Sequence, residues 1–322
     1  MSRIPQVGRR GIVLLIAAII LVGIVPGVAA AEQRTGGSVT VGENETVSED
    51  LTAVGGSVSI RGTVEGDVQT IAGSVVIEDG AEVTGDVAAT VAEILGLHNN
   101  VETAAFTQSS GASGSALRWG MSVPEGPTLV IAADTPRGEP DDAVDHAAGA
   151  GAVAFLVADD GLVEIEATAT YTEEFPGTRF REHGAVAIDT YDATAYEREA
   201  YETVVTGAVE ALSESPTAIA PTAPNGKLPY RVARQHDDDI DVYQNASDLG
   251  DTGAASAFFG LLSAWADDRD EVTVVAYGDG SSAVAVHVAG TLDVTWDRET
   301  VDISYAEYAR KRGHIVATRG DD

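Results

Sequence analysis

Cysteine is absent from this 322-residue chain, and its 19 lysines and arginines are outnumbered by 51 aspartates and glutamates, for a formal net charge of −32. Without thiols, the chain has no disulfide, no thiolate metal site and no cysteine nucleophile. Without a basic patch, it repels nucleic acid and anionic lipid. The six histidines stand apart without metal-ligand spacing, so we assign no metal. This acidic excess favours a protein of a halophilic archaeon over an ordinary acidic protein, since a dense carboxylate surface stays hydrated in salt.

One long hydrophobic run lies at the N-terminus. Three arginines precede the apolar residues 12–25, and Pro26 and small residues at 29–31 follow them. This order predicts a signal peptide over residues 1–31, with an uncleaved membrane anchor as the alternative. In both cases the bulk of the chain is expected to be extracellular. A cytoplasmic location is the alternative if the segment is not used for export.

A short repeat follows, with GGSVTV at 36–41, GGSVSI at 55–60 and AGSVVI at 72–77, at spacings of 19 and 17 residues. Each unit alternates β-branched with small or polar residues and carries glycine at its corners, which is typical of strands joined by tight bends. A β-hairpin meander is the alternative. The segment 36–88 resembles the bactofilin-like polymer-forming repeats. That resemblance implies a short right-handed β-helix whose coils stack end to end.

From about residue 90 the pattern changes to alternating helices and strands. Helical periodicity and short continuous apolar runs predict helices at 91–97, 113–121 and 201–212, and strands at 128–134, 152–159 and 271–278. Continuous apolar strands are typical of sheets buried on both faces. The alternation predicts an α/β domain.

Several segments of this second part carry a specific resemblance. They are LVIAADTPRG (129–138), DHAAGAGAVAFLVAD (145–159), APNGKLPYRVA (223–233), LGDTGAASAFFGLLSA (249–264), YGDGSSAVAV (277–286) and ISYAEYARKRGHI (303–315). In this order they resemble the last two thirds of an archaeal hydroxymethylglutaryl-CoA synthase, a thiolase-fold condensing enzyme. The resemblance implies an incomplete thiolase-like domain of layered α/β sheets over 90–322, whose first half lacks its opening strands and leaves apolar edges exposed.

The resemblance also implies where the family's chemical groups fall. The cysteine that takes the acyl group from CoA falls on Ser110, the histidine that positions the acyl-CoA carbonyl falls on Thr222, and a conserved asparagine falls on Asp251. We find no counterpart of the family's glutamate acid and base.

The resemblance also implies four further positions in or beside the acyl-CoA pocket. They are Asn225, Lys227, Gly278 and Gly280. The alternatives are a solvated charge for the lysine and a plain hairpin turn for the glycines.

These replacements predict that condensation is lost. A serine hydroxyl is a weak nucleophile unless an adjacent base removes its proton, and Thr222 offers no such base. Asp251 places negative charge where an enolate or thioester oxygen needs a hydrogen-bond donor. Loss of a catalytic unit costs on the order of 10⁴–10⁶ in rate. A hydrolase at Ser110 would need a histidine base, and the candidates are His183 and His287, although nothing in the sequence argues for either. His287 lies in an apolar alternating run and is expected to be an ordinary strand histidine.

Three hypotheses follow. The preferred one is a non-catalytic thiolase-like protein, exported or membrane-anchored through its N-terminal segment, that acts in association or scaffolding with copies of itself or a thiolase-fold paralogue. The second is an acyl-CoA condensing enzyme, or a cytoplasmic subunit completed by such a paralogue or by a zinc-ribbon/OB partner, with acyl-CoA as substrate and no other cofactor. The third is a recombined reading frame whose product is barely folded.

Overall fold

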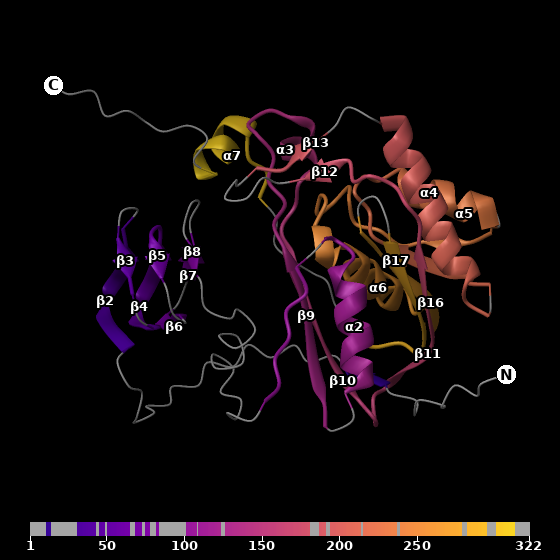
Figure 1. Ribbon diagram of the computed structural model, residues 1–322, viewed down its shortest axis with the longest axis horizontal. Helices are drawn as coiled ribbons and strands as arrows, with labels where there is room; N and C mark the ends of the chain where they lie inside the picture. Colours follow the sequence, from indigo (N-terminus) through magenta and orange to yellow (C-terminus); the bar gives the residue numbers. More distant parts are fainter. Residues whose placement is uncertain are drawn as a thin grey trace. The chain divides into compact units, whose positions relative to one another are not determined.

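The protein's computed structural model describes residues 11–13, 31–42, 45–48, 50–64, 68–72, 75–77, 82–83, 101–107, 109–123, 126–180, 187–190, 194–213, 215–236, 239–278, 282–294 and 301–312. Contacts divide the chain into two compact units (Figure 1). One unit comprises residues 17–106, and the other comprises residues 1–16 together with 107–322.

Parallel strands build the unit of residues 17–106. Its first sheet contains β2 (Ala31–Val41), β4 (Asp50–Ile60), β6 (Val68–Ala72) and β7 (Val75–Ile77), and its second contains β3 (Thr46–Val47), β5 (Thr63–Val64) and β8 (Glu82–Val83). Val39 pairs with Val58, and Val58 pairs in turn with Val75, so equivalent residues of successive repeats lie side by side. None of the described pairs in this unit is the antiparallel pair that a β-hairpin meander requires.

The alternating valines and isoleucines of these strands form a small core. It contains Val39, Val41, Val47, Leu51, Ala53, Ile60 and Val64. Thr40, between two core valines, is exposed, as the two-residue period of a strand requires. Gly62 lies at a corner where a Cβ atom would stand 2.2 Å from the carbonyl oxygens of Gly42 and Glu45. Glycine at this corner therefore permits adjacent turns to stack.

An eight-stranded sheet forms the centre of the other unit. Its order is β15 (Asp241–Val242), β14 (Ala218–Pro221), β16 (Glu271–Gly278), β17 (Ser282–Ala289), β11 (Val163–Thr172), β1 (Gly11–Val13), β10 (Gly151–Ala158) and β9 (Thr128–Asp134). The strand β14, second from one end of the sheet, runs parallel to β15 and β16, whereas the remaining neighbours are antiparallel. Parallel neighbours need crossover connections, which α5 (Leu228–His236) and α6 (Ser256–Ala266) supply. The predicted α/β class is confirmed.

Helices cover both faces of the sheet around β16 and β17 (Figure 1). On one face, α2 (Ala112–Ser122) and α6 pack against Val272 and Val274. On the other, α4 (Thr194–Glu210) and α5 pack against Val275 and Tyr277. Every residue of β16 after Glu271 is consequently buried, which confirms the prediction for the strand at 271–278.

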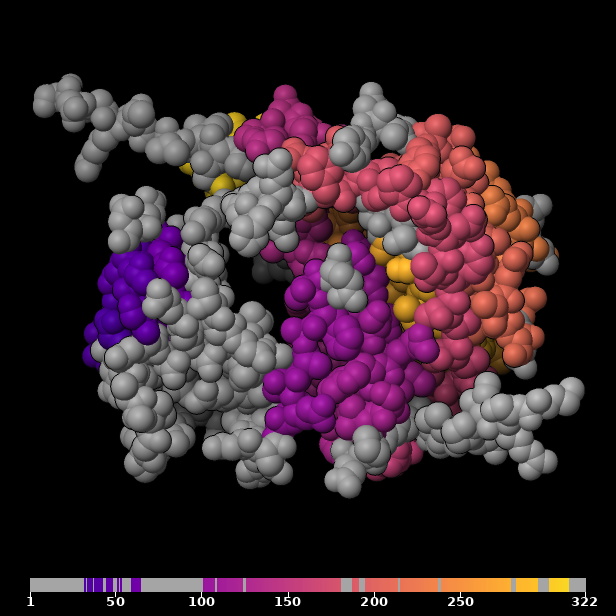
Figure 2. Space-filling view, in the orientation of Figure 1, coloured from indigo at the N-terminus to yellow at the C-terminus, as the bar shows by residue number. Residues whose placement is uncertain are grey.

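The helix α2 approaches this sheet closely because it carries glycine where it meets β16 and β17. A Cβ atom at Gly114 would lie 2.7 Å from the Cβ of Val284 and 2.8 Å from that of Ala276. A neighbouring side of α2 is open, since Arg118 and Ser122 are exposed. Figure 2 shows atoms of this segment, in purple, on the surface that faces the viewer.

Burial on both faces is wrong for the predicted strands at 128–134 and 152–159. In β9 and β10 buried residues alternate with partly or fully exposed ones, and Ile131 is 41% exposed. The helix α2 covers one face of β9, but no helix in the described part of the chain buries the other. The strand β9 is the last strand in the order of this sheet.

Three short elements complete this unit. They are α3 (Ala143–Ala147), α7 (Tyr305–Lys311) and the pair β12 (Arg179–Phe180) and β13 (Asp189–Thr190). Two tyrosine hydroxyls of α7, those of Tyr305 and Tyr308, donate to the buried carboxylate of Asp145 in α3 at 2.9 and 2.8 Å. These bonds hold α7 against α3.

Most of the predicted signal peptide lies outside the described residues, as do the expected helix at 91–97 and Gly280. Within the predicted signal peptide, residues Gly11–Val13 form β1, which pairs antiparallel with β10 and β11. Among the helices of the described ranges, none combines the length and apolarity needed to cross a membrane.

Candidate functional site

The turn that carries Ser110 lies at the N-terminus of α2. The amide of Ala112 donates to the carbonyl oxygen of Ser109 at 2.9 Å. A Cβ atom on Gly111 would lie 2.8 Å from the nitrogen of Gly278, and one on Gly278 would lie 2.5 Å from Ser109 Oγ. The two glycines therefore let the turn approach the end of β16. This contact explains Gly278 without assigning it a ligand.

Thr222 follows β14 directly and is 2% exposed. Its Oγ1 accepts a hydrogen bond from the amide of Tyr277 at 3.0 Å, and its carbonyl oxygen accepts one from the hydroxyl of Tyr201 at 2.7 Å. Burial raises the pKa of Tyr201 well above its ordinary value. The threonine hydroxyl thus ties the loop after β14 to the end of β16 through a bond that supplies no base.

Asp251 is buried and paired. Its Oδ2 lies 2.6 Å from Arg179 Nη1, and its Oδ1 accepts the amide hydrogen of Gly253 at 2.9 Å. Its backbone is held too, because its nitrogen donates to the carbonyl oxygen of Ala147 at 2.7 Å and its own oxygen accepts from Gly149 at 2.7 Å. The Arg179 guanidinium therefore balances the charge of this carboxylate, and the Gly253 amide satisfies its other oxygen.

The three predicted catalytic positions come together around Arg179. A cavity of about 20 Å³ is lined by Ser110, Arg179, Glu197, Tyr201, Thr222, Pro224 and Tyr277. The guanidinium of Arg179 lies 3.5 Å from the carbonyl oxygen of Pro224 and 3.7 Å from Glu197 Oε1. Since a cavity needs about 10–15 Å³ of such space to hold one water molecule, this cavity has room for about one water.

Sequence reasoning missed both Arg179 and Glu197. The scarcity of basic residues was an available signal, because an arginine in so acidic a chain needs a reason to be there. Nothing in the sequence, however, indicated that a residue at 179 reaches one at 251, which is 72 positions away. Only the fold brings this pair together.

The remaining predicted pocket residues have local roles or lie on the surface. The Oδ1 atom of Asn225 accepts the amide hydrogens of Lys227 and Leu228 at 3.0 and 3.2 Å, and so caps the start of α5. The Lys227 side chain is exposed. Neither residue lines the cavity beside Ser110.

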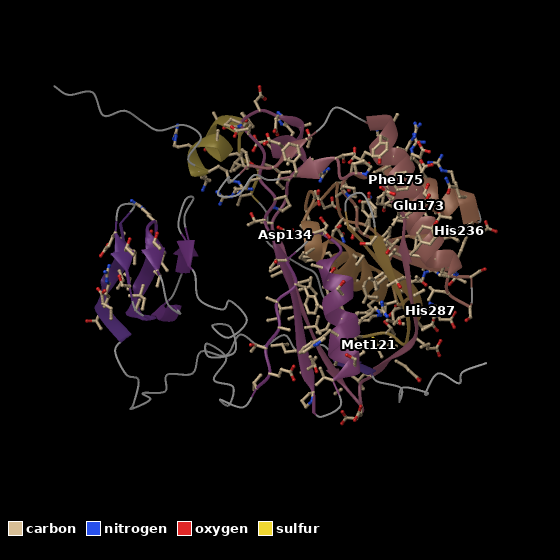
Figure 3. The ribbon with its side chains drawn as sticks, viewed as in Figure 1. Met121, Asp134, Glu173, Phe175, His236 and His287 are labelled. Carbon is tan, nitrogen blue, oxygen red and sulfur yellow. The ribbon has the colours of Figure 1, made fainter. Side chains whose placement is uncertain are left out.

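Neither histidine considered as a hydrolase base is placed near Ser110 in the described part of the site. His287, labelled in Figure 3, lies on β17 and pairs through Nδ1 with Thr273 Oγ1 at 2.9 Å. This confirms the expected strand histidine. Thr273 stands four residues before Tyr277 on β16, so His287 lies about 13 Å along the sheet from the cavity at a rise of about 3.3 Å per residue. His183 lies outside the described residues.

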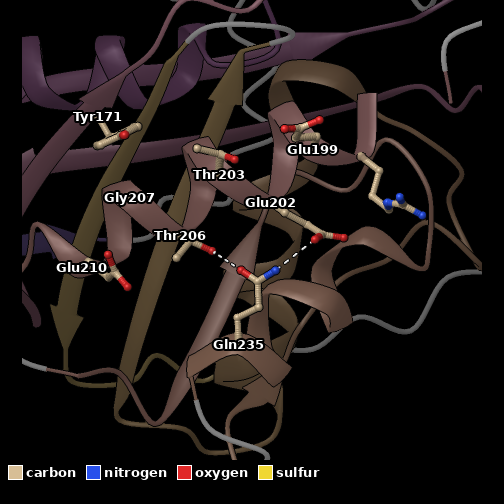
Figure 4. A pocket seen from close by; sticks show the side chains of 9 residues that line it. Tyr171, Glu199, Glu202, Thr203, Thr206, Gly207, Glu210 and Gln235 are labelled. Carbon is tan, nitrogen blue, oxygen red and sulfur yellow. Dashed lines mark hydrogen bonds between the residues drawn. The ribbon is translucent and has the colours of Figure 1, made fainter. Parts of the chain in front are cut away.

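A larger groove of about 400 Å³ lies away from these residues (Figure 4). It is lined by Tyr171, Arg198, Glu199, Glu202, Thr203, Thr206, Gly207, Glu210 and Gln235. Gln235 of α5 bridges to α4, accepting from Thr206 Oγ1 at 3.0 Å and donating to Glu202 at 2.9 Å. The groove contains none of the predicted site residues.

The described residues also bear on glycosylation and on metal binding. In the sequon Asn245-Ala-Ser, the side-chain nitrogen of Asn245 is buried and its Oδ1 accepts from Ser263. A glycan cannot be attached there in the folded protein. Within the described ranges, no group of three or more histidine, aspartate or glutamate side chains is arranged to hold a metal ion.

Comparisons with known proteins agree with the resemblance seen in the sequence. The chain is 29% identical over 212 residues to the hydroxymethylglutaryl-CoA synthase of Methanosphaera stadtmanae, covering 58% of this chain and 60% of the relative. It is 26% identical over 254 residues to that of Archaeoglobus fulgidus, covering 70% and 73%. No protein-family model matches the chain.

Solved structures share the fold at low identity. A structure described as HMG-CoA synthase complexed with CoA superposes with a TM-score of 0.56 at 18% identity, covering 63% of this chain and 60% of that one. The 3-oxoacyl-(acyl carrier protein) synthase III of Pseudomonas aeruginosa superposes with a TM-score of 0.52 at 16% identity, covering 65% and 73%.

The chain thus contains a thiolase-like α/β fold, which these structures match over 63–65% of its length. Within that class, the chain is homologous to the hydroxymethylglutaryl-CoA synthases at 26–29% identity. It spans about 60% of the length of the M. stadtmanae relative.

Proposed function

We propose that this protein is a non-catalytic thiolase-fold homologue of hydroxymethylglutaryl-CoA synthase that serves in association or scaffolding. The observation that carries the proposal is the neighbourhood of Ser110. Around that hydroxyl lie a threonine engaged with the backbone, an arginine bound to Asp251, and a carboxylate, Glu197, that faces the same arginine, all about a cavity of about 20 Å³.

Physical chemistry supports this interpretation in two ways. First, an alcohol needs a base to become a nucleophile, and Thr222 Oγ1 already accepts a backbone amide hydrogen. Second, an acyl thioester needs space beside the nucleophile and donors aimed at its oxygen. The guanidinium of Arg179 is the donor at hand, and it is directed at Asp251.

The test is acyl transfer to the purified full-length chain. We expect radiolabelled acetyl-CoA to leave no more label on the wild-type protein than on Ser110→Ala. Ser122→Ala, which changes an exposed serine at the end of α2, is the matched control. Label that is lost in Ser110→Ala and retained in Ser122→Ala contradicts the proposal.

A condensing enzyme, or a subunit completed by a partner, is the second candidate. The observation that favours it is the homology itself, since the curated relatives are named hydroxymethylglutaryl-CoA synthases. Such a subunit needs to remain in the cytoplasm, where CoA thioesters are made. Cytoplasmic protein with residues 1–31 intact, which forms hydroxymethylglutaryl-CoA when a thiolase-fold paralogue is added, supports this candidate. An outward-facing, cleaved form excludes it.

For the unit of residues 17–106, we propose a short bactofilin-like β-helix that promotes self-association of an exported or anchored protein. Its support is the parallel pairing of equivalent repeat residues and their valine-rich core. N-terminal sequencing of native protein tests export, because cleavage near residue 31 is expected. Sedimentation at rising concentration tests association, and a strictly monomeric chain argues against it.

A further inference from the structure

We propose that Arg179 is a built-in ligand of the thiolase-like site: its side chain closes the cavity beside Ser110 and keeps outside molecules away from it. Arg179 lies on β12, in a segment separate from those that carry Ser110, Thr222 and Asp251. The fold therefore brings a fourth segment into the site. This inference deepens the proposed non-catalytic function and rests on it.

The guanidinium of Arg179 lies beside oxygen atoms of three other residues. Asp251 binds it at 2.6 Å, the carbonyl oxygen of Pro224 lies at 3.5 Å, and Glu197 lies at 3.7 Å. These acceptors come from three different segments of the chain, so they define a guanidinium-binding site and not a chance surface contact. The fork-shaped guanidinium suits several oxygen acceptors at once, which a lysine ammonium does not match.

The Arg179–Asp251 ion pair is largely shielded from solvent. The Asp251 side chain is 5% exposed and that of Arg179 is 22% exposed. Partly buried pairs are screened by salt much less than exposed ones. The ion pair is therefore expected to persist in concentrated salt, where exposed pairs of this acidic chain are weakened.

Removing the Arg179 side chain should open the cavity onto Ser110. An arginine truncated to alanine loses its guanidinium and most of its methylene stem, and the space that they fill lies against the residues lining the cavity. The absence of native cysteine allows this to be measured directly, because a single introduced thiol reports access to its own position.

The experiment measures the reaction of Ellman's reagent with Ser110→Cys in the full-length chain. We expect labelling of Ser110→Cys to be at least about tenfold slower than labelling of Ser122→Cys on the exposed end of α2, because access requires the side chain at 179 to move aside. Adding Arg179→Ala is expected to speed labelling at 110 by about tenfold or more, and to leave labelling at 122 unchanged.

Two controls separate opening of the cavity from loss of the fold. Arg179→Met removes the charge but retains most of the volume, so labelling at 110 should remain slow. Thr273→Cys, at a fully buried position on β16, should stay unreactive in the Arg179→Ala background. If labelling at 110 is as fast as at 122 in the wild-type background, the proposal is overturned. Equal acceleration at 110 and 273 overturns it as well, since that indicates global unfolding.

These outcomes are independent of the test of catalysis. A freely accessible thiol at 110 refutes the role of Arg179 but leaves the replacement of the thiol and imidazole by Ser110 and Thr222, and hence the non-catalytic proposal, untouched. Acyl transfer onto the native Ser110 refutes the non-catalytic proposal, whatever the labelling rates of the introduced thiols.

Discussion

Replacing Asp251 by asparagine is expected to destabilise the unit that carries the site by about 2–3 kcal/mol. Breaking one partner out of a buried ion pair costs about 3–5 kcal/mol, whereas an exposed pair contributes about 0–1 kcal/mol. The pair with Arg179 lies nearer the buried limit, since the two side chains are 5% and 22% exposed. Glu197, at 3.7 Å from the same guanidinium, offsets part of the lost charge, which places the expected value below the full buried cost.

Asparagine isolates the effect of charge because it leaves the neighbouring hydrogen bond possible. The amide of Gly253 donates to Asp251 Oδ1 at 2.9 Å, and an asparagine oxygen can accept the same bond. For a domain of 150–250 residues, each kcal/mol shifts the melting temperature by about 2–4 °C. The expected decrease is therefore about 4–12 °C.

The assay is urea unfolding in concentrated KCl, followed by tryptophan fluorescence. All three tryptophans lie beyond residue 106, so their emission reports the unit that holds the site. Asp241→Asn is the matched control, because Asp241 pairs with Arg269 and both side chains are about half exposed, at 48% and 42%. It should cost a small fraction of the effect of Asp251→Asn.

The reasoning is refuted if Asp251→Asn costs no more than Asp241→Asn. It is also refuted if the cost of Asp251→Asn is unchanged in an Arg179→Met background, since a double-mutant cycle must then show no coupling between the two side chains.

Three further predictions concern packing and titration. Gly114→Ala should destabilise the same unit by about 1–3 kcal/mol through overpacking, while Gly226→Ala, whose Cβ would meet nothing closer than 3.8 Å, should change urea unfolding little. Leu51→Ala, in the core of the repeat unit, should cost that unit about 2–5 kcal/mol, seen in circular dichroism without a change in tryptophan emission. Burial and a neighbouring carboxylate raise the pKa of Tyr305 and of Tyr308, so their contribution to stability is complete below about pH 10 and is lost as the pH rises through the folded-state pKa. Above about pH 10, the melting temperature of Tyr305→Phe should consequently fall less steeply with pH than that of the wild type. An equal slope contradicts a stabilising hydrogen bond from Tyr305 to Asp145.

Local patterns in the sequence determined much of the architecture. The continuous apolar runs at 128–134 and 271–278 coincide with β9 and β16, and the helical period at 113–121 falls within α2. The repeat spacing of 19 and 17 residues equals the offset of the paired strands. Such features are encoded in neighbouring side chains, because strand and helix periodicity follow from backbone geometry.

The burial of the strands was decided by the tertiary structure. The apolar sequences of β9 and β16 look alike, yet β16 is covered on both faces while Ile131 of β9 is 41% exposed. Which face of a strand is covered depends on helices that are distant in the sequence. A single-sequence pattern therefore cannot distinguish these two strands.

In the candidate site, too, some features were predicted from the sequence and others were decided by the fold. The resemblance of short motifs was enough to predict Ser110, Thr222 and Asp251 as the counterparts of the family's chemical groups. The partner of Asp251 could not be read from the sequence, because Arg179 reaches it across 72 residues through the fold. Residue types alone predicted which chemistry the chain lacks. The packing of distant segments decided what fills that place, since an ion pair depends on separation in space and not on separation along the chain.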